Sequence, residues 1–205
     1  MDYETIPPKE IIEKTVKALT ERGIEVIIVD DKESALQKVK EAIPQGASVM
    51  NGSSRTLEQI GFVEYLKSGE HGWNNLHAAI LAEQDKAKQM QLRMQSSFAE
   101  YFLGSVHAIT QEGQTLTASA SGSQIPPYAF TARNIIWVAS SNKIVPSIEE
   151  GLKRIREYSF PLESERMKSL GYPGSSINKI LIFERESTMM GRKVRMILVN
   201  EKLGF

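Results

Sequence analysis

The order of apolar runs and small-residue loops in residues 24–61 is the feature that most restricts the fold of this chain. Residues 24–30 (IEVIIVD) form a β-branched run, which is typical of a buried strand. Residues 31–43 then repeat apolar side chains at helical spacing. A second apolar run and a small-residue loop, NGSSRT (51–56), precede another helical pattern. This alternation predicts a mostly parallel sheet covered by helices.

The loop at 51–56 lies where a parallel strand is expected to end, and open α/β sheets bind ligands at that edge. It offers unpaired backbone N–H groups, hydroxyls and the positive end of a helix dipole to an anion. Ser and Thr are also the usual helix caps, and the two interpretations are compatible. The candidate ligand-binding residues of this loop are Asn51, Gly52, Ser53, Ser54 and Thr56.

Composition restricts the classes of function. A length of 205 residues suits one domain, so we expect a single α/β domain over residues 1–205. The 25 Lys and Arg residues balance 25 Asp and Glu residues, which gives no support for a nucleic-acid partner. The absence of cysteine excludes disulfides, thiol nucleophiles and Cys-type zinc sites, and it fits a reducing cytoplasm.

The N-terminal sequence lacks the basic and apolar regions of a signal peptide. No apolar run approaches the roughly 18–20 residues that span a bilayer. We therefore expect a cytoplasmic protein with no membrane partner.

The three histidines do not predict a metal site. His71 and His77 are six positions apart, which matches neither the helical nor the strand spacing of a metal-binding pair. His107 lies in an expected strand, where a packed histidine with satisfied hydrogen bonds is favoured. We expect no bound metal and no cofactor.

Residues 83–103 carry apolar side chains at steps of three and four, which predicts one long helix. The stripe consists of Ala87, Met90, Met94, Phe98 and Tyr101. Such a stripe indicates packing, and its length makes it a possible homodimer element.

Three further loops are expected at strand ends. Glu112 lies in the turn of an expected hairpin, where its carboxylate can face either solvent or a crevice. Two other loops follow apolar runs and carry small or polar residues, namely Ser121, Gly122 and Ser123 in one and Asn142 and Lys143 in the other. We expect these loops to meet the 51–56 loop and to share a ligand site.

Taken together, these segments resemble the LUD (lactate-utilisation) domain family, which includes LutC- and YkgG-like proteins. The segments that carry the resemblance are NGSSRTLEQIGF (51–62), SVHAITQEGQTL (105–116), ASGSQIPPYAF (120–130), NIIWVASSNKIVPSIEEGLKRIRE (134–157) and GRKVRMILVNEKLGF (191–205). The resemblance extends from about residue 10 to the C-terminus.

The resemblance implies a three-layer α/β fold of the NagB/RpiA/CoA-transferase-like type. It also implies a role in bacterial oxidation of lactate or other small organic acids, beside iron–sulfur and flavin partner proteins. Two departures stand out. Many relatives carry a Gly-Asn-Arg loop where this chain has residues 121–124 (SGSQ), and many carry a cysteine-rich insert where this chain has only residues 169–179.

Two functional hypotheses remain open. In the first, the protein binds or converts a small anionic metabolite, which is a carboxylate, a phosphate or an acyl-CoA. The 52–56 loop then holds the anion, Lys143 adds a point charge, and Glu112 is the general base or the nucleophile. In the second, the protein is a non-catalytic accessory or regulatory subunit of an organic-acid oxidation complex with redox partner proteins. A purely structural domain is disfavoured by the number of small polar loops.

Overall fold

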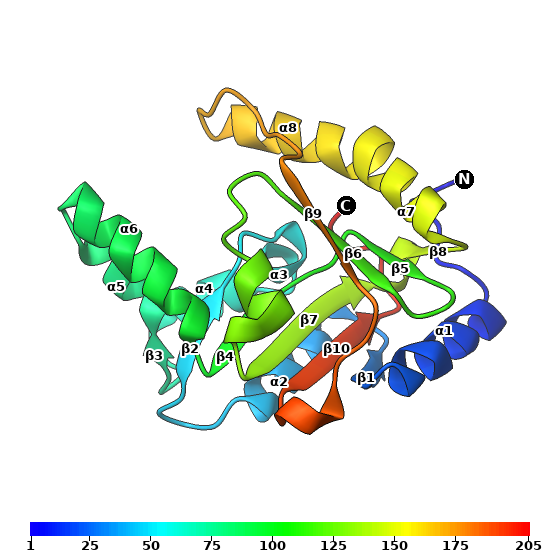
Figure 1. Ribbon diagram of the computed structural model, residues 1–205, viewed down its shortest axis with the longest axis horizontal. Helices are drawn as coiled ribbons and strands as arrows, with labels where there is room; N and C mark the ends of the chain where they lie inside the picture. Colours follow the sequence, from blue (N-terminus) through cyan, green and yellow to red (C-terminus); the bar gives the residue numbers. More distant parts are fainter.

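The computed structural model describes residues 1–205, apart from the side chain of Thr188. Its centre is a six-stranded sheet in which all neighbouring strands run parallel (Figure 1). In order across the sheet, the strands are β1 (Ile24–Val29), β10 (Lys193–Val199), β7 (Asn134–Ser140), β4 (Tyr101–Gly104), β2 (Ser48–Asn51) and β3 (Asn74–Asn75).

A second, four-stranded sheet lies over one face of the central sheet (Figure 1). Its strands are β8 (Ile144–Val145), β5 (Ala108–Thr110), β6 (Thr115–Ser119) and β9 (Lys179–Phe183). β5 and β6 form the expected antiparallel hairpin, and β9 pairs antiparallel with β6.

Helices cover the remaining surfaces of both sheets. They are α1 (Lys9–Glu21), α2 (Lys32–Ala42), α3 (Arg55–Gln59), α4 (Phe62–Ser68), α5 (Leu76–Ala82), α6 (Lys86–Gln95), α7 (Ile148–Arg154) and α8 (Phe160–Ser169). α2, α3 and α4 pack on one face of the central sheet, whereas α7 packs on the outer face of the small sheet. No helix among the described residues is long and apolar enough to cross a membrane.

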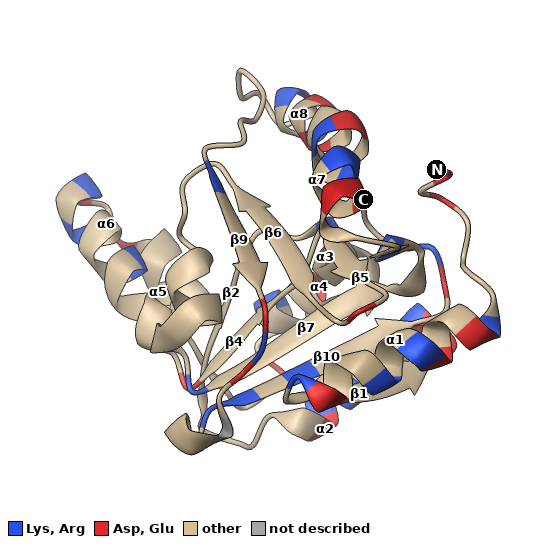
Figure 2. Cartoon of the chain, turned by 45° about the vertical axis from the view of Figure 1, so that its right-hand side comes forward, with Lys and Arg blue, Asp and Glu red and all other residues tan. Residues whose placement is uncertain are grey.

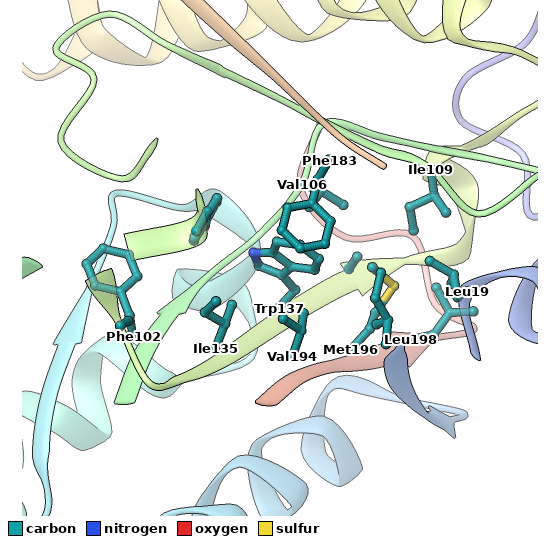
Figure 3. Packing of buried hydrophobic residues seen from close by; sticks show 14 of the residues in the cluster. Leu19, Phe102, Val106, Ile109, Ile135, Trp137, Phe183, Val194, Met196 and Leu198 are labelled. Carbon is teal, nitrogen blue, oxygen red and sulfur yellow. The ribbon is translucent and has the colours of Figure 1, made fainter. Parts of the chain in front are cut away.

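The core between the two sheets is built around Trp137 of β7. Its ring packs edge-on against Phe183 of β9, with the ring centroids 5.2 Å apart (Figure 3). It also packs edge-on against Tyr128, with the ring centroids 5.4 Å apart. Leu19 of α1 and Ile109 of β5 extend the same cluster. β7 contains no charged residue and is buried on both faces, as expected for the middle of a parallel sheet (Figure 2).

The predicted α/β fold with a three-layer, mostly parallel arrangement is confirmed. The expected helix over 83–103 is wrong. α6 ends at Gln95, a short 3-10 helix follows at Ser96–Phe98, and residues 101–104 form the central strand β4. Phe102 and Leu103 are buried on opposite faces of the sheet. A short apolar run does not distinguish a buried strand from a helix end by periodicity alone.

Candidate functional site

The carboxyl ends of β2, β4 and β7 bring three segments distant in sequence to one edge of the central sheet. Thr56 follows β2, Ser105 follows β4, and Lys143 follows β7. The three residues line a cavity of about 50 Å³, the lysine cavity, which lies where open α/β sheets bind ligands.

Lys143 is the chemical centre of this cavity. Its side chain is 2% exposed, and its Nζ donates to three neutral oxygens. These are Thr56 Oγ1 at 3.2 Å, Ser105 Oγ at 3.1 Å and the backbone oxygen of Val106 at 3.1 Å. Burial, assisted by the charge of Arg154, holds the pKa of Lys143 well below its usual 10.5.

The other charged side chains lining the lysine cavity are neutralised by neighbours. Arg55 pairs with Glu58 at 3.1 Å, and Glu163 pairs with Arg166 at 2.8 Å. Lys143 forms no ion pair with any carboxylate of the described residues. A buried ammonium group without a counter-charge is costly, and a bound anion would offset that cost.

Two hydroxyls are arranged to donate into the same cavity. Thr56 and Ser105 both accept a hydrogen bond from Lys143 Nζ. The nearest acceptors for the Ser105 hydroxyl are Thr56 Oγ1 at 3.5 Å and the Val106 oxygen at 3.4 Å, which are long for an O–H···O bond. The Ser105 proton is therefore available to an anion.

His107 contributes a neutral N–H group to this edge. Its Nδ1 accepts from the backbone N–H of Ala118 at 3.2 Å, which places the ring proton on Nε2. Burial, together with the charges of Lys143 and Arg154, lowers the pKa of His107 to about 3. His107 lines the lysine cavity and a neighbouring cavity of about 50 Å³.

Arg154 places a second buried cation behind His107. Its guanidinium is completely buried, and Nη1 donates to the His107 oxygen and to Ser159 Oγ. Its Nε and Nη2 have no hydrogen-bond partner among the described residues. The rings of Tyr158 and Tyr3 lie 5.0 Å and 5.7 Å from the guanidinium carbon. Burial lowers the pKa of Arg154 to about 10.

The predicted 51–56 loop lies at the lysine cavity, but two of its hydroxyls also form hydrogen bonds within the protein. Ser54 Oγ accepts from Leu57 N at 3.2 Å and caps α3, so the predicted cap is confirmed. Ser53 Oγ accepts from Arg166 at 3.0 Å. Because α3 is only five residues long, we assign no anion site to its N-terminus. Ligand binding by this loop stays a prediction.

A larger cavity of about 300 Å³ adjoins the lysine cavity, and the two share Ser53 and Ser54. We call it the serine cavity, since six serines line it: Ser53, Ser54, Ser96, Ser97, Ser121 and Ser123. The predicted residues Asn51 and Gly52 lie here. A Cβ at Gly52 would come within 2.8 Å of Gln124 Oε1, so Gln124 would have to shift to admit a side chain there. Gly122 lines a further apolar groove beside this cavity.

Glu112 and Asn142 do not lie at these cavities. The hairpin turn carrying Glu112 packs on α1, where the carboxylate is 63% exposed and pairs with Lys14 at 3.0 Å. A Cβ at Gly113 would lie 2.7 Å from the backbone of Ala18, which shows how closely this turn approaches α1. Asn142 is buried, and its Nδ2 donates to the backbone oxygen of Tyr3 at 3.0 Å. Neither is part of the site that we propose.

Sequence reasoning missed several residues of this edge, namely Ser105, His107, Arg154 and Gly204. The assignment of residues 101–103 to a helix obscured the role of Ser105, which directly follows β4, and His107 was expected to be a packed histidine of a strand. Gly204 has a positive φ of 62°, and a Cβ there would lie 2.3 Å from Thr56 Oγ1 and 3.2 Å from Lys143 Nζ.

Comparison with known proteins identifies the family. No curated protein matches the chain. A crystal structure of a DUF162 family protein from Deinococcus radiodurans aligns with a TM-score of 0.52 and 12% sequence identity, covering 94% of this chain and 98% of that one. This likeness concerns the fold. Residues 12–185 match the LUD domain. Since this match covers most of the sequence, the chain belongs to the LUD domain family.

Proposed function

We propose that this protein binds a small anionic metabolite, through a carboxylate or phosphate group, in the lysine cavity. The observation that carries the proposal is Lys143, a buried lysine that is hydrogen-bonded only to neutral oxygens and lines a cavity at the carboxyl edge of the sheet. An anion placed there supplies the missing counter-charge. Membership of the LUD domain family supports a setting in the metabolism of lactate or related organic acids.

The neighbouring donors fit the same ligand. The Thr56 and Ser105 hydroxyls accept from Lys143, so their own protons are free to donate to an anion. His107 adds a neutral N–H donor, because its Nδ1 is already occupied by Ala118. In this arrangement, one positive charge and three neutral donors surround a space of about 50 Å³, which suits a single carboxylate or phosphate group.

The decisive experiment compares the purified protein with Lys143→Met, which retains side-chain volume and removes the charge. Phosphate and L-lactate are titrated while the melting temperature is followed, because a ligand that binds the folded state stabilises it by about 2.7 kcal/mol at 100 times its Kd. We expect at least one anion to stabilise the wild type and neither to stabilise Lys143→Met. Lys17→Met, whose lysine on α1 is 81% exposed, should respond as the wild type does.

Two results would contradict the proposal. One is a wild type whose melting temperature does not change with either anion. The other is an equal response in Lys143→Met.

A non-catalytic accessory subunit of an organic-acid oxidation complex is the second candidate function. The observation that favours it is the apolar face of α6 and the turn after it, where Met90, Met94 and Phe98 are 58%, 68% and 71% exposed. Exposed apolar patches of this kind mark interaction sites. Binding of a purified flavin or iron–sulfur partner that is lost in Phe98→Ser, with no anion response in the wild type, would favour this candidate.

A further inference from the structure

The lysine cavity is the inner end of a longer series of connected sites. It shares Ser53 and Ser54 with the serine cavity, as described above. The serine cavity in turn shares Ser121 and Ser123 with an outer groove of about 510 Å³. This apolar groove is lined by Met90, Met94 and Phe98 together with Pro126. The three cavities are therefore neighbours, and we call the series that runs from Lys143 to α6 the ligand path.

The middle of this path has a mixed lining of polar and apolar residues. Six serines, Asn51 and His77 line the serine cavity, together with the charged residues Glu58 and Arg93 and the apolar residues Met50, Val63 and Phe102. His77 Nδ1 lies 3.3 Å from Asn51 Oδ1, and burial lowers the pKa of His77, which favours its neutral form. The serines, Asn51 and His77 offer several neutral hydrogen-bond donors and acceptors, which suit a hydroxyl-rich group such as a sugar ring. An alkyl chain in the same position would leave these polar groups without partners.

The outer end of the path is apolar and carries one cation. α6 buries none of its residues within the described structure, so its methionines are free to contact a ligand. Arg93 lines both the serine cavity and the apolar groove, and it forms no ion pair with the described carboxylates. Methionine sulfur, phenylalanine and arginine each stack favourably on a flat aromatic ring.

We infer that the ligand is a nucleoside phosphate, with its phosphate at Lys143, its sugar in the serine cavity and its base on the apolar groove. This inference rests on the proposed function, because the phosphate is the anion of the lysine cavity. The order of an anion site, a hydroxyl-lined space and an apolar surface matches the order of the three parts of a nucleotide. A sugar phosphate alone would leave Met90, Met94 and Phe98 without contact.

The first test compares inorganic phosphate, ribose 5-phosphate and AMP as ligands of the full chain by calorimetry. Stacking a base on side chains of this kind strengthens binding by about tenfold or more. We expect AMP to bind at least about tenfold more tightly than ribose 5-phosphate. If AMP binds no more tightly, or if only lactate binds, the nucleotide inference is wrong and the anion site stands. If neither lactate nor any of the three phosphates binds, both proposals are wrong.

The second test removes the apolar surface without touching the anion site. Met94→Ser and Phe98→Ser change exposed side chains, so neither should unfold the protein. We expect each to reduce the advantage of AMP over ribose 5-phosphate while the affinity for ribose 5-phosphate stays unchanged. The control is Met189→Ser, which changes a 93% exposed methionine remote from the groove and should behave as the wild type.

A second copy of this chain is the competing occupant of the groove. In that case the wild type is a dimer that Phe98→Ser dissociates, and the affinity for AMP is the same in both. Light scattering on the two proteins distinguishes the alternatives, and that combination of results would overturn the inference.

Discussion

Lys143 Nζ lies 3.1 Å from Ser105 Oγ, although 38 positions separate the two residues in the sequence. The contact follows from sheet topology. β4 and β7 are parallel neighbours with Gly104 opposite Trp137, so the segments that follow them leave at the same edge. Tyr128 fixes the Ser105 segment, since its hydroxyl donates to the Ser105 oxygen at 3.2 Å. The sheet thus holds the Lys143 amine and a hydroxyl donor together before a ligand arrives.

The first prediction concerns the charge of Lys143 and folding stability. The pKa of this lysine is lowered in the folded state, so the unfolded state binds its proton more readily below pH 10.5. The wild type therefore loses stability relative to Lys143→Met as the pH falls from 10.5, by about 1.4 kcal/mol for each unit by which the pKa is lowered. Urea unfolding between pH 7 and 10 measures this difference.

The matched control for this prediction is Lys17→Met, whose lysine is largely exposed. Relative to the wild type, Lys143→Met should show the larger pH dependence of stability of the two variants over the same range. A parallel pH dependence in Lys143→Met and Lys17→Met would show that burial does not affect the charge of Lys143.

The second prediction concerns His107 in acid. Its folded pKa of about 3 lies below the usual 6.5, so its neutral form contributes stability that is lost as the pH falls from 6.5 toward 3. The loss has an upper limit of about 1.4 kcal/mol per pH unit. His107→Asn places an amide oxygen where Nδ1 accepts from Ala118, and it does not titrate. In urea unfolding, we expect the stability of this variant to fall less than that of the wild type between pH 6.5 and 3. An equal fall in both proteins would show that groups other than His107 cause the loss of stability in acid.

The third prediction concerns Glu112. Its pair with Lys14 joins side chains that are 63% and 55% exposed, and such surface pairs contribute about 0–1 kcal/mol. Glu112→Gln should therefore change stability little and leave anion affinity equal to that of the wild type, as measured by the same thermal titration. A loss of anion binding in Glu112→Gln would show that Glu112 takes part in anion binding.

The sequence predicted the features that depend on neighbouring residues, but it did not predict those that depend on contacts between distant segments. Alternating apolar runs and loops are local features, so they indicated the α/β class, the 51–56 loop and Lys143. The site also needs Ser105 and His107, whose position depends on β4 joining the middle of the sheet. That pairing is set by Phe102 and Leu103 packing on opposite faces, a tertiary effect that a helical stripe over 83–103 obscured.

Glu112 shows the opposite error. The hairpin and its turn were predicted correctly, but the direction of the turn was not, because it depends on the contact of Gly113 with α1. Arg154 is a third case, since a helical arginine is expected to face solvent and here it lies behind His107. In each case, local sequence indicated the element, and packing between elements decided which side chains reach the cavity.

The last prediction concerns Gly204, which follows β10 and lies against Thr56 and Lys143. Its positive φ of 62° costs an alanine about 1 kcal/mol, and the added Cβ would lie 2.3 Å from Thr56 Oγ1. Gly191→Ala is the matched control, because Gly191 has φ of 66° with no atom within 4 Å of the added Cβ. In urea unfolding, both variants should be less stable than the wild type because alanine is strained at a positive φ. Only Gly204→Ala should also displace Thr56 from Lys143 and weaken anion binding, and equal anion affinity in the two variants would show that Thr56 does not contact the ligand.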